Sequence, residues 1–268
     1  MLFAASLFTC ALLATTAFAA PRGTGLQERM ARRRAGRMSG PRLPASGIAS
    51  NLVTNNTHAE VSSNWAGAAF ESPAGTYKSV TGTFVVPTPK VPSGSSTSGS
   101  YAASAWVGID GDTCGTAILQ TGIDFNIDDG RVSYDAWFEY FPAFATDFTG
   151  ITIAAGNTIK LTATASSTTS GTVTIENVST GVTVSKALTS SAKLCLENAE
   201  WIVEDFEEGN SLVPFANFGT VTFTSAQATT ESGSVVGPTG AVIIDLEQNN
   251  KVLTSVSSSS SSVTVTYI

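Results

Sequence analysis

Histidine is almost absent from this sequence. The 268 residues include a single one, His58, and the body of the chain from residue 60 onward has none. This absence excludes from the body the Ser-His-Asp and Cys-His catalytic arrangements, His-based zinc sites and any imidazole base. Gly-rich phosphate loops, dinucleotide fingerprints and the G-x-S-x-G nucleophile elbow are missing as well. Acid–base chemistry is therefore left to carboxylates, which titrate near about pH 4 and suit an acidic medium.

Charged residues are also scarce, at 13% of the chain, and they are unevenly placed. Seven of the fourteen Lys and Arg residues lie between Pro21 and Pro44, whereas twenty of the twenty-one Asp and Glu residues lie between Glu60 and Ile268. That body carries a formal charge of −13, from 7 basic and 20 acidic residues. Such a body is poorly suited to nucleic acid, and acid relieves its self-repulsion. The basic arm before it is either a nucleic-acid-binding or membrane-binding tail, or a pro-segment held on the acidic body by charge.

Long hydrophobic runs are absent after residue 20. Residues 1–20 form a short apolar run that ends in Ala17-Phe18-Ala19, which is typical of a secretory signal with a small-residue cleavage site, although the basic n-region is missing. The alternative is a membrane anchor, for which the run is barely long enough. We expect residues 1–20 to be a cleaved signal and residues 21–59 a basic pro-segment whose end lies within 50–60. Residues 60–268 would form one secreted, extracellular domain, monomeric and with neither membrane nor nucleic acid as partner.

Cysteine is equally scarce, with three in the chain. Cys10 would leave with the signal, so Cys114 and Cys195 remain as an even pair, which predicts one disulfide in a secreted protein. Closing about 80 residues, it would contribute about 4.5 kcal/mol in the chain-entropy model. Two Cys without a nearby His argue against a metal site, and we expect neither metal nor cofactor.

Ser, Thr, Gly and Val are abundant, and this mixture favours strands and turns over helices. From Val61 onward, short strand-like runs alternate with turn clusters about every ten residues. The pattern predicts an all-β domain, an antiparallel sandwich or barrel.

Strand alternation groups the polar residues, because alternate residues of a strand share a face. Four strand-like runs each place a carboxylate or amide on one face, and three of them add an aromatic or apolar residue. They are Trp106 with Asp110, Gln120 with Asp124, Asp135 with Trp137 and Glu139, and Glu200 and Ile202 with Glu204 and Phe206. Together they would form an acidic, aromatic face that fits an extended polymer. Residues four apart on one strand are about 13 Å apart, so a catalytic carboxylate pair would have to form across strands. Taken singly, each Trp is consistent with core packing, Asp110 and Asp112 with a turn, and Gln120 with a satisfied core amide.

Five collinear blocks resemble the fungal glutamic peptidases (eqolisins) of the scytalidoglutamic and aspergilloglutamic type. The blocks are residues 63–67 (SNWAG), 105–114 (AWVGIDGDTC), 116–122 (TAILQTG), 134–137 (YDAW) and 198–208 (NAEWIVEDFEE). The resemblance runs from about Ser62 to the C-terminus. The signal and the basic pro-segment also fit the layout of this family.

The resemblance implies a β-sandwich of two curved, about seven-stranded antiparallel sheets and an acid endopeptidase that acts on proteins and peptides. It implies Glu204 as general base and acid on water, Gln120 as oxyanion stabiliser, and the pro-segment as an intramolecular inhibitor. The substrate cleft that it implies consists of Trp65, Trp106, Asp110, Asp124, Asp135, Trp137, Glu139, Phe141 and Phe206. Where the scytalidoglutamic type has a tyrosine, this chain has Phe141, so a hydroxyl contact is lost there unless Tyr140 replaces it.

Two other classes of protein would also use acidic and aromatic residues on a β-sandwich. A glycoside hydrolase needs two carboxyl groups flanking the scissile bond, whereas only one Glu is paired with an amide here. A lectin-like carbohydrate-binding module needs no catalytic pair at all. The peptidase interpretation is therefore preferred over both.

Overall fold

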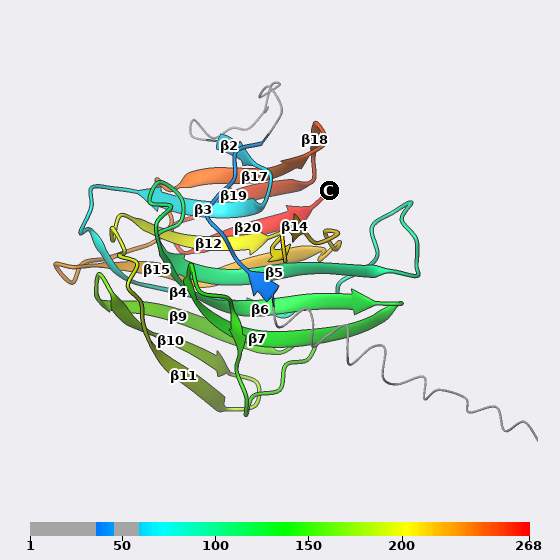
Figure 1. Cartoon of the computed structure of the whole chain (residues 1–268). Coiled ribbons are helices and arrows are strands. Elements are labelled where there is room, and N and C mark those ends of the chain that lie inside the picture. Colours follow the sequence, from blue (N-terminus) through cyan, green and yellow to red (C-terminus); the bar gives the residue numbers. More distant parts are fainter. Residues whose placement is uncertain (1–35, 46–58) are drawn as a thin grey trace, which may run out of the picture.

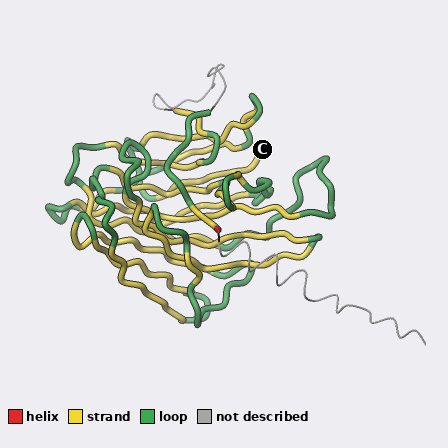
Figure 2. Tube along the Cα trace, viewed as in Figure 1, coloured by secondary structure: helices red, strands yellow, loops and turns green. Residues whose placement is uncertain are grey.

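The strand-forming composition of the chain is realised throughout the fold. The computed structural model describes residues 36–45 and 59–268, and the twenty elements that it defines are all β-strands (Figures 1 and 2). The all-β sandwich predicted from the sequence is confirmed. Residues 1–35 and 46–58, which include the expected signal, most of the expected pro-segment and His58, lie outside the described residues. Within the described ranges, no helix is long and apolar enough to span a membrane.

Two large sheets form the sandwich, and both are antiparallel except for one parallel edge pair between β2 and β17. The first sheet has the order β18 (Lys251–Val252), β17 (Val242–Gln248), β3 (Trp65–Glu71), β12 (Asn198–Glu204), β5 (Ser100–Ile109), β6 (Ile118–Asp128), β7 (Arg131–Phe141) and β8 (Thr146–Asp147), with β2 (Ala59–Ser62) beside β17. The second has the order β11 (Val182–Thr189), β10 (Ser170–Asn177), β9 (Thr158–Ser167), β4 (Tyr77–Val85), β15 (Thr220–Thr230), β20 (Ser262–Tyr267) and β19 (Thr254–Ser258), with β16 (Val235–Val236) beside β15. A third, small sheet joins β1 (Arg37–Met38), β13 (Glu207–Glu208) and β14 (Ser211–Leu212).

The hydrophobic core lies between the two large sheets. Strand alternation sends the odd-numbered residues of β5, such as Ala105 and Val107, into this core, where Phe84 and Phe223 from the second sheet pack. Trp201 of β12 belongs to the same core and donates its indole N–H to the carbonyl oxygen of Thr81 (2.8 Å). This tryptophan is therefore a packing residue of the sandwich.

The other three tryptophans form a second apolar cluster on the opposite face of the first sheet. Trp65, Trp106 and Trp137 are each fully buried there. Gly122 lies between two of them, and a Cβ atom at this position would come within 2.5 Å of the Trp106 Cβ and 2.8 Å of Trp137 Cζ2. Glycine is thus required for the indoles to close over the centre of the sheet.

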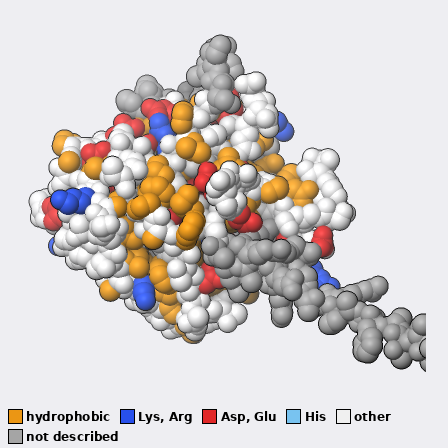
Figure 3. Space-filling model, in the orientation of Figure 1, with side chains coloured by type: hydrophobic (Ala, Val, Ile, Leu, Met, Phe, Trp, Pro, Cys, Tyr) orange, Lys and Arg blue, Asp and Glu red, His pale blue; other side chains and the backbone are white. Residues whose placement is uncertain are grey.

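A short segment from the basic arm lies across this tryptophan face. Its strand β1 pairs antiparallel with β13, so that Arg37 is opposite Glu208 and Met38 is opposite Glu207. Figure 1 shows this strand (dark blue) crossing in front of β5 and β6. On the face of the molecule in Figure 3, hydrophobic side chains gather near the middle and the few Lys and Arg side chains are scattered. Part of the expected pro-segment therefore covers the face on which the predicted site residues lie.

Candidate active site

The strands of the first sheet bring the predicted polar residues into rows that cross the sheet. Read from β12 through β5 and β6 to β7, three successive rows contain Glu204, Ser104, Asp124 and Asp135; Ile202, Trp106, Gly122 and Trp137; and Glu200, Gly108, Gln120 and Glu139. Opposite residues in neighbouring strands point to the same side, and rows two residues apart share a face. Four stretches that are distant in the sequence thus contribute to one surface.

Glu204 is held between two indole groups on this surface. The Trp65 Nε1–H donates to Oε1 (3.3 Å) and the Trp106 Nε1–H donates to Oε2 (2.9 Å). Burial raises the pKa of the Glu204 carboxyl to about 8, against the lowering effects of the Ser39 hydroxyl, Arg37 and the two indoles. Burial beneath the arm segment thus favours the protonated form of Glu204.

Gln120 presents its amide to the backbone of the arm segment. Its Nε2 donates to the carbonyl oxygen of Ser39 (2.7 Å), and its Oε1 is buried without a hydrogen-bond partner among the described residues. Ser39 also donates its backbone N–H to Glu139 Oε2 (3.0 Å). One residue of the arm thus bonds Gln120 by its carbonyl and Glu139 by its N–H, and its buried hydroxyl faces Glu204 without a well-formed hydrogen bond.

Arg37 fills a buried acidic pocket two residues before Ser39. Its guanidinium pairs with Asp124 at two points, Nε to Oδ2 (2.6 Å) and Nη2 to Oδ1 (2.8 Å). Nη2 also donates to Ser104 Oγ (3.1 Å), and Nη1 lies 3.5 Å from Glu139 Oε2. Burial raises the pKa of Glu139 well above its usual value, although Arg37 acts in the opposite direction. The pocket gathers several carboxyl groups around one cation.

Aromatic rings complete the pocket around the guanidinium. The Arg37 Cζ lies 3.8 Å from the ring centroid of Trp137 and 4.5 Å from that of Phe206. Cation–π contacts of this kind are strongest when the cation is desolvated, and Arg37 is 3% exposed. Asp135, half-buried and hydrogen-bonded to Asn126 (3.0 Å), lines the outer part of the same pocket.

Phe141 lies at the edge of the tryptophan cluster, where it is partly buried. Tyr140 does not supply the hydroxyl that this position lacks, because its ring belongs to the sandwich core and its O–H donates to the carbonyl oxygen of Thr168 (3.0 Å). Adjacent strand residues point to opposite faces, so Tyr140 is turned away from the site. The sequence-based suggestion that it could replace a cleft tyrosine is wrong.

Asp110 is the one predicted cleft residue that the structure does not bring to this surface. Its Oδ2 accepts the backbone N–H groups of Cys195 (2.7 Å) and Leu196 (2.8 Å), and its Oδ1 accepts those of Glu197 (2.9 Å) and Asn198 (3.1 Å). It is fully buried and has φ of 67°. The strand alternation used to predict its direction ends at Ile109, so Asp110 clamps the segment that leads into β12.

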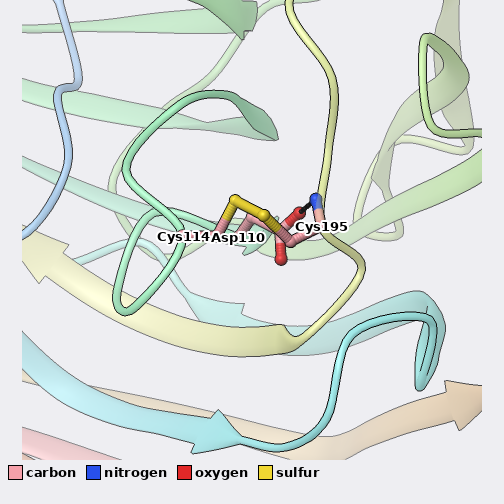
Figure 4. Close-up of side chains that lie close together, drawn as sticks. All are labelled: Asp110, Cys114 and Cys195. Carbon is pink, nitrogen blue, oxygen red and sulfur yellow. Dashed lines mark hydrogen bonds between the residues drawn. A yellow bond between two sulfur atoms is a disulfide. The ribbon is translucent and has the colours of Figure 1, made fainter.

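The predicted disulfide between Cys114 and Cys195 is formed beside this clamp (Figure 4). Asp110, Cys114 and Cys195 are the group in the described part of the chain with donor atoms close enough to hold a metal ion. The sulfur atoms of Cys114 and Cys195 are bonded to each other, and the Asp110 carboxylate already accepts four backbone N–H groups. This set therefore does not fit a metal ion.

Sequence reasoning missed three contributors to the site. Ser104 has the parity of Trp106, bonds Arg37 and accepts the Trp137 indole N–H (3.1 Å), so alternation could have identified it. Nothing in the sequence distinguishes Arg37 from the other arginines of the arm, or Ser39 from the many serines. Their roles depend on where the arm lies on the fold.

Comparison with known proteins agrees with the geometry. A family model described as the peptidase A4 family matches residues 63–267. Aspergillopepsin-2 of Aspergillus niger is 47% identical over 281 residues, which covers 98% of this chain and 99% of that protein. Scytalidopepsin B of Scytalidium lignicola is 43% identical and covers 98% of each chain.

Solved structures of glutamic peptidases are also similar to this chain in fold. Scytalido-glutamic peptidase with a transition-state analog inhibitor has a TM-score of 0.70 at 43% identity, over 77% of this chain and 98% of that one. Aspergilloglutamic peptidase from Aspergillus niger has a TM-score of 0.61 at 58% identity, over 63% of this chain and 99% of that one. The sequence match, the shared sandwich and the row of carboxyl, amide and indole groups agree, and this chain belongs to the peptidase A4 (eqolisin) family and is a glutamic peptidase.

Proposed function

We propose that this peptidase is a secreted acid endopeptidase that cleaves proteins with a dyad of Glu204 and Gln120. One observation carries the proposal: a peptide carbonyl, that of Ser39, already accepts a hydrogen bond from Gln120 Nε2 at 2.7 Å beside the Glu204 carboxyl. A substrate carbonyl held in the same way would be polarised by the amide and would face the carboxyl group.

The mechanism assigns one task to each member of the dyad. Ionised Glu204 takes a proton from a water molecule, which attacks the carbonyl carbon. The Gln120 amide donates to the oxyanion that develops, a contribution typically on the order of 10²–10³ in rate. Protonated Glu204 then delivers its proton to the leaving nitrogen. The indoles of Trp65 and Trp106 keep both carboxyl oxygens oriented through these steps.

The arm segment inhibits the precursor in this proposal. Arg37 and Ser39 occupy the positions that substrate would need, and burial beneath the segment raises the Glu204 pKa to about 8. Because burial favours its protonated form, the covered Glu204 is a less available base, and hydrolysis is slow while the segment is bound. Departure of the segment hydrates the cleft, which removes the main cause of that shift and returns the carboxyl towards its usual range.

Acid would weaken the attachment of the segment by protonating Asp124, whose carboxylate pairs with Arg37 at two points. Glu139 and Glu204 also face the guanidinium, and Asp135, Asp147 and Glu208 line the pocket wall. The guanidinium keeps its charge at every relevant pH, so protonation of its partners removes the attraction. Maturation would then be autocatalytic, and a purified Glu204→Gln precursor should remain uncut after acidification. Normal maturation of that variant would contradict self-cleavage.

The decisive experiment for the function compares two substrates with the matured enzyme. We expect cleavage of an acid-denatured protein in the presence of pepstatin, and no release of reducing sugar from polysaccharides. Reducing-sugar release without proteolysis would overturn the proposal in favour of a glycoside hydrolase. Recovery of the chain from the culture medium of an expressing fungus, eluting as a monomer, tests secretion and oligomeric state.

A further inference from the structure

The arm segment crosses the active site as an extended peptide held at both ends. Upstream of Ser39, the Gly36 carbonyl accepts the Gly209 N–H (3.0 Å), and downstream the Arg42 N–H donates to the Gly111 carbonyl (2.9 Å). These bonds use backbone atoms, so they do not depend on the side chains of the segment. The backbone of residues 36–43 is therefore held in the way that an extended peptide substrate could be held.

The reactive groups meet this peptide at one residue. The Ser39 carbonyl accepts from Gln120 Nε2 at 2.7 Å, and the Ser39 N–H donates to Glu139 at 3.0 Å. Hydrogen bonds at both the N–H and the carbonyl fix the plane of the residue whose carbonyl carbon would be attacked. The bond that follows this carbonyl joins Ser39 to Gly40. A side chain at Gly40 would meet no atom within 4 Å, so the site accepts the leaving residue without crowding.

Two features keep that bond intact in this state. Ser39 is fully buried, and its hydroxyl lies beside the Glu204 carboxyl, where the attacking water has to be. A water molecule can enter only after the hydroxyl turns away about the Cα–Cβ bond. The arrangement is that of an enzyme–substrate complex in which a substrate hydroxyl takes the place of water.

We propose that Ser39–Gly40 is the first peptide bond that the precursor hydrolyses in itself, and that the Ser39 hydroxyl delays this cut. The inference rests on the proposed peptidase function. Water adds through its oxygen to the Ser39 carbonyl carbon while Glu204, in its ionised form, takes one of its protons. The C–N bond to Gly40 then breaks, and the nitrogen receives the proton from Glu204. The products are a carboxylic acid at Ser39 and an amine at Gly40.

The test follows the first seconds to minutes of maturation of the full precursor by intact-mass spectrometry. We expect the earliest products to be a fragment that ends at Ser39 and a partner that begins at Gly40, formed at a first-order rate independent of precursor concentration. Earliest products in which the Ser39–Gly40 bond is intact would overturn the inference. If such precursors still mature and cleave denatured protein, the inference alone has failed. If they cleave no protein at all, the proposed function has failed.

A side-chain variant tests the delaying role of the hydroxyl. Ser39→Ala frees the position beside Glu204 for water, and we expect the same first cut about fivefold faster, which corresponds to about 1 kcal/mol in the barrier. Ser98→Ala, in an exposed loop, is the matched control and should mature at the wild-type rate. A purely structural role for the Ser39 hydroxyl predicts an unchanged or slower cut, and either result would overturn this role.

Discussion

The guanidinium of Arg37 and the carboxylate of Asp124 form a buried two-point ion pair, with N–O distances of 2.6 and 2.8 Å. The partners are 87 positions apart, one on the arm segment and the other on β6 beside the catalytic surface. This pair joins the arm segment to the site that it covers, and it is the contact most directly open to mutation.

Replacing Arg37 by Ala should weaken latency. Removal of one partner from a buried ion pair leaves the other uncompensated and typically costs about 3–5 kcal/mol, here in attachment of the segment. We expect the Arg37→Ala precursor to hydrolyse a peptide substrate in mildly acidic buffer in which the wild-type precursor is still latent. Arg131→Ala, at an exposed position at the start of β7, is the control and should stay latent. Equal latency of the Arg37→Ala and wild-type precursors would show that the pair does not hold the segment.

Substitution of either dyad residue should abolish acid proteolysis without unfolding the chain. Gln120→Ala removes the oxyanion donor, with an expected loss on the order of 10²–10³ in kcat, and Glu204→Gln removes the base altogether. Thermal unfolding and circular dichroism report whether the fold is kept. Glu176→Gln, on β10 in the other large sheet, is the control and should retain activity. Wild-type-like proteolysis by either dyad variant would refute the assignment.

The precursor should lose stability as pH rises from acid to neutral. The pKa of Glu204 is raised from 4.5 to about 8 and that of Asp245 from 3.8 to about 6, mainly by burial. The folded state then holds more protons than the unfolded chain between these values, so stability is full below about pH 4 and declines towards about pH 8. Denaturant unfolding of a Gln120→Ala precursor, which keeps Glu204 but should not mature, measures this slope.

Glu200 offers a direct check on that slope. Both of its carboxyl oxygens are buried without a hydrogen-bond partner among the described residues, and burial raises its pKa well above the usual value. Glu200→Gln keeps the shape and removes the titration, so the loss of stability towards about pH 8 should become smaller. Stability that increases with pH in the parent precursor would contradict the prediction.

Asp110→Asn should reduce stability and leave substrate binding unchanged. The carboxylate accepts four backbone N–H groups, and an amide in its place would oppose its own N–H donors to some of them. An unsatisfied buried donor costs about 1–3 kcal/mol. We expect a lower free energy of unfolding with an unaltered KM for peptide substrate in the matured enzyme. A raised KM with an unchanged free energy of unfolding would instead show that Asp110 takes part in substrate binding, as the family resemblance implies.

Much of this protein follows from the sequence alone. Period-two alternation predicts the sandwich because one face of each strand must be buried, and it groups Gln120 with Asp124 and Trp137 with Glu139 for the same reason. The absence of histidine restricts acid–base chemistry in the body of the chain to carboxyl groups, and the two cysteines of the body can pair only with each other within it. These are properties of composition and local geometry, which require no knowledge of distant contacts.

Only the tertiary structure decided the direction of Asp110 and the roles of Arg37 and Ser39, because these features depend on contacts between residues far apart in the chain. Strand alternation cannot predict that Asp110 points away from the active-site surface. Its positive φ arises where β5 ends and its carboxylate binds the backbone of residues 195–198. Nor can composition single out Arg37 and Ser39 within a basic, serine-containing arm. Their significance comes from β1 pairing with β13, which places one guanidinium on Asp124 and one carbonyl on Gln120.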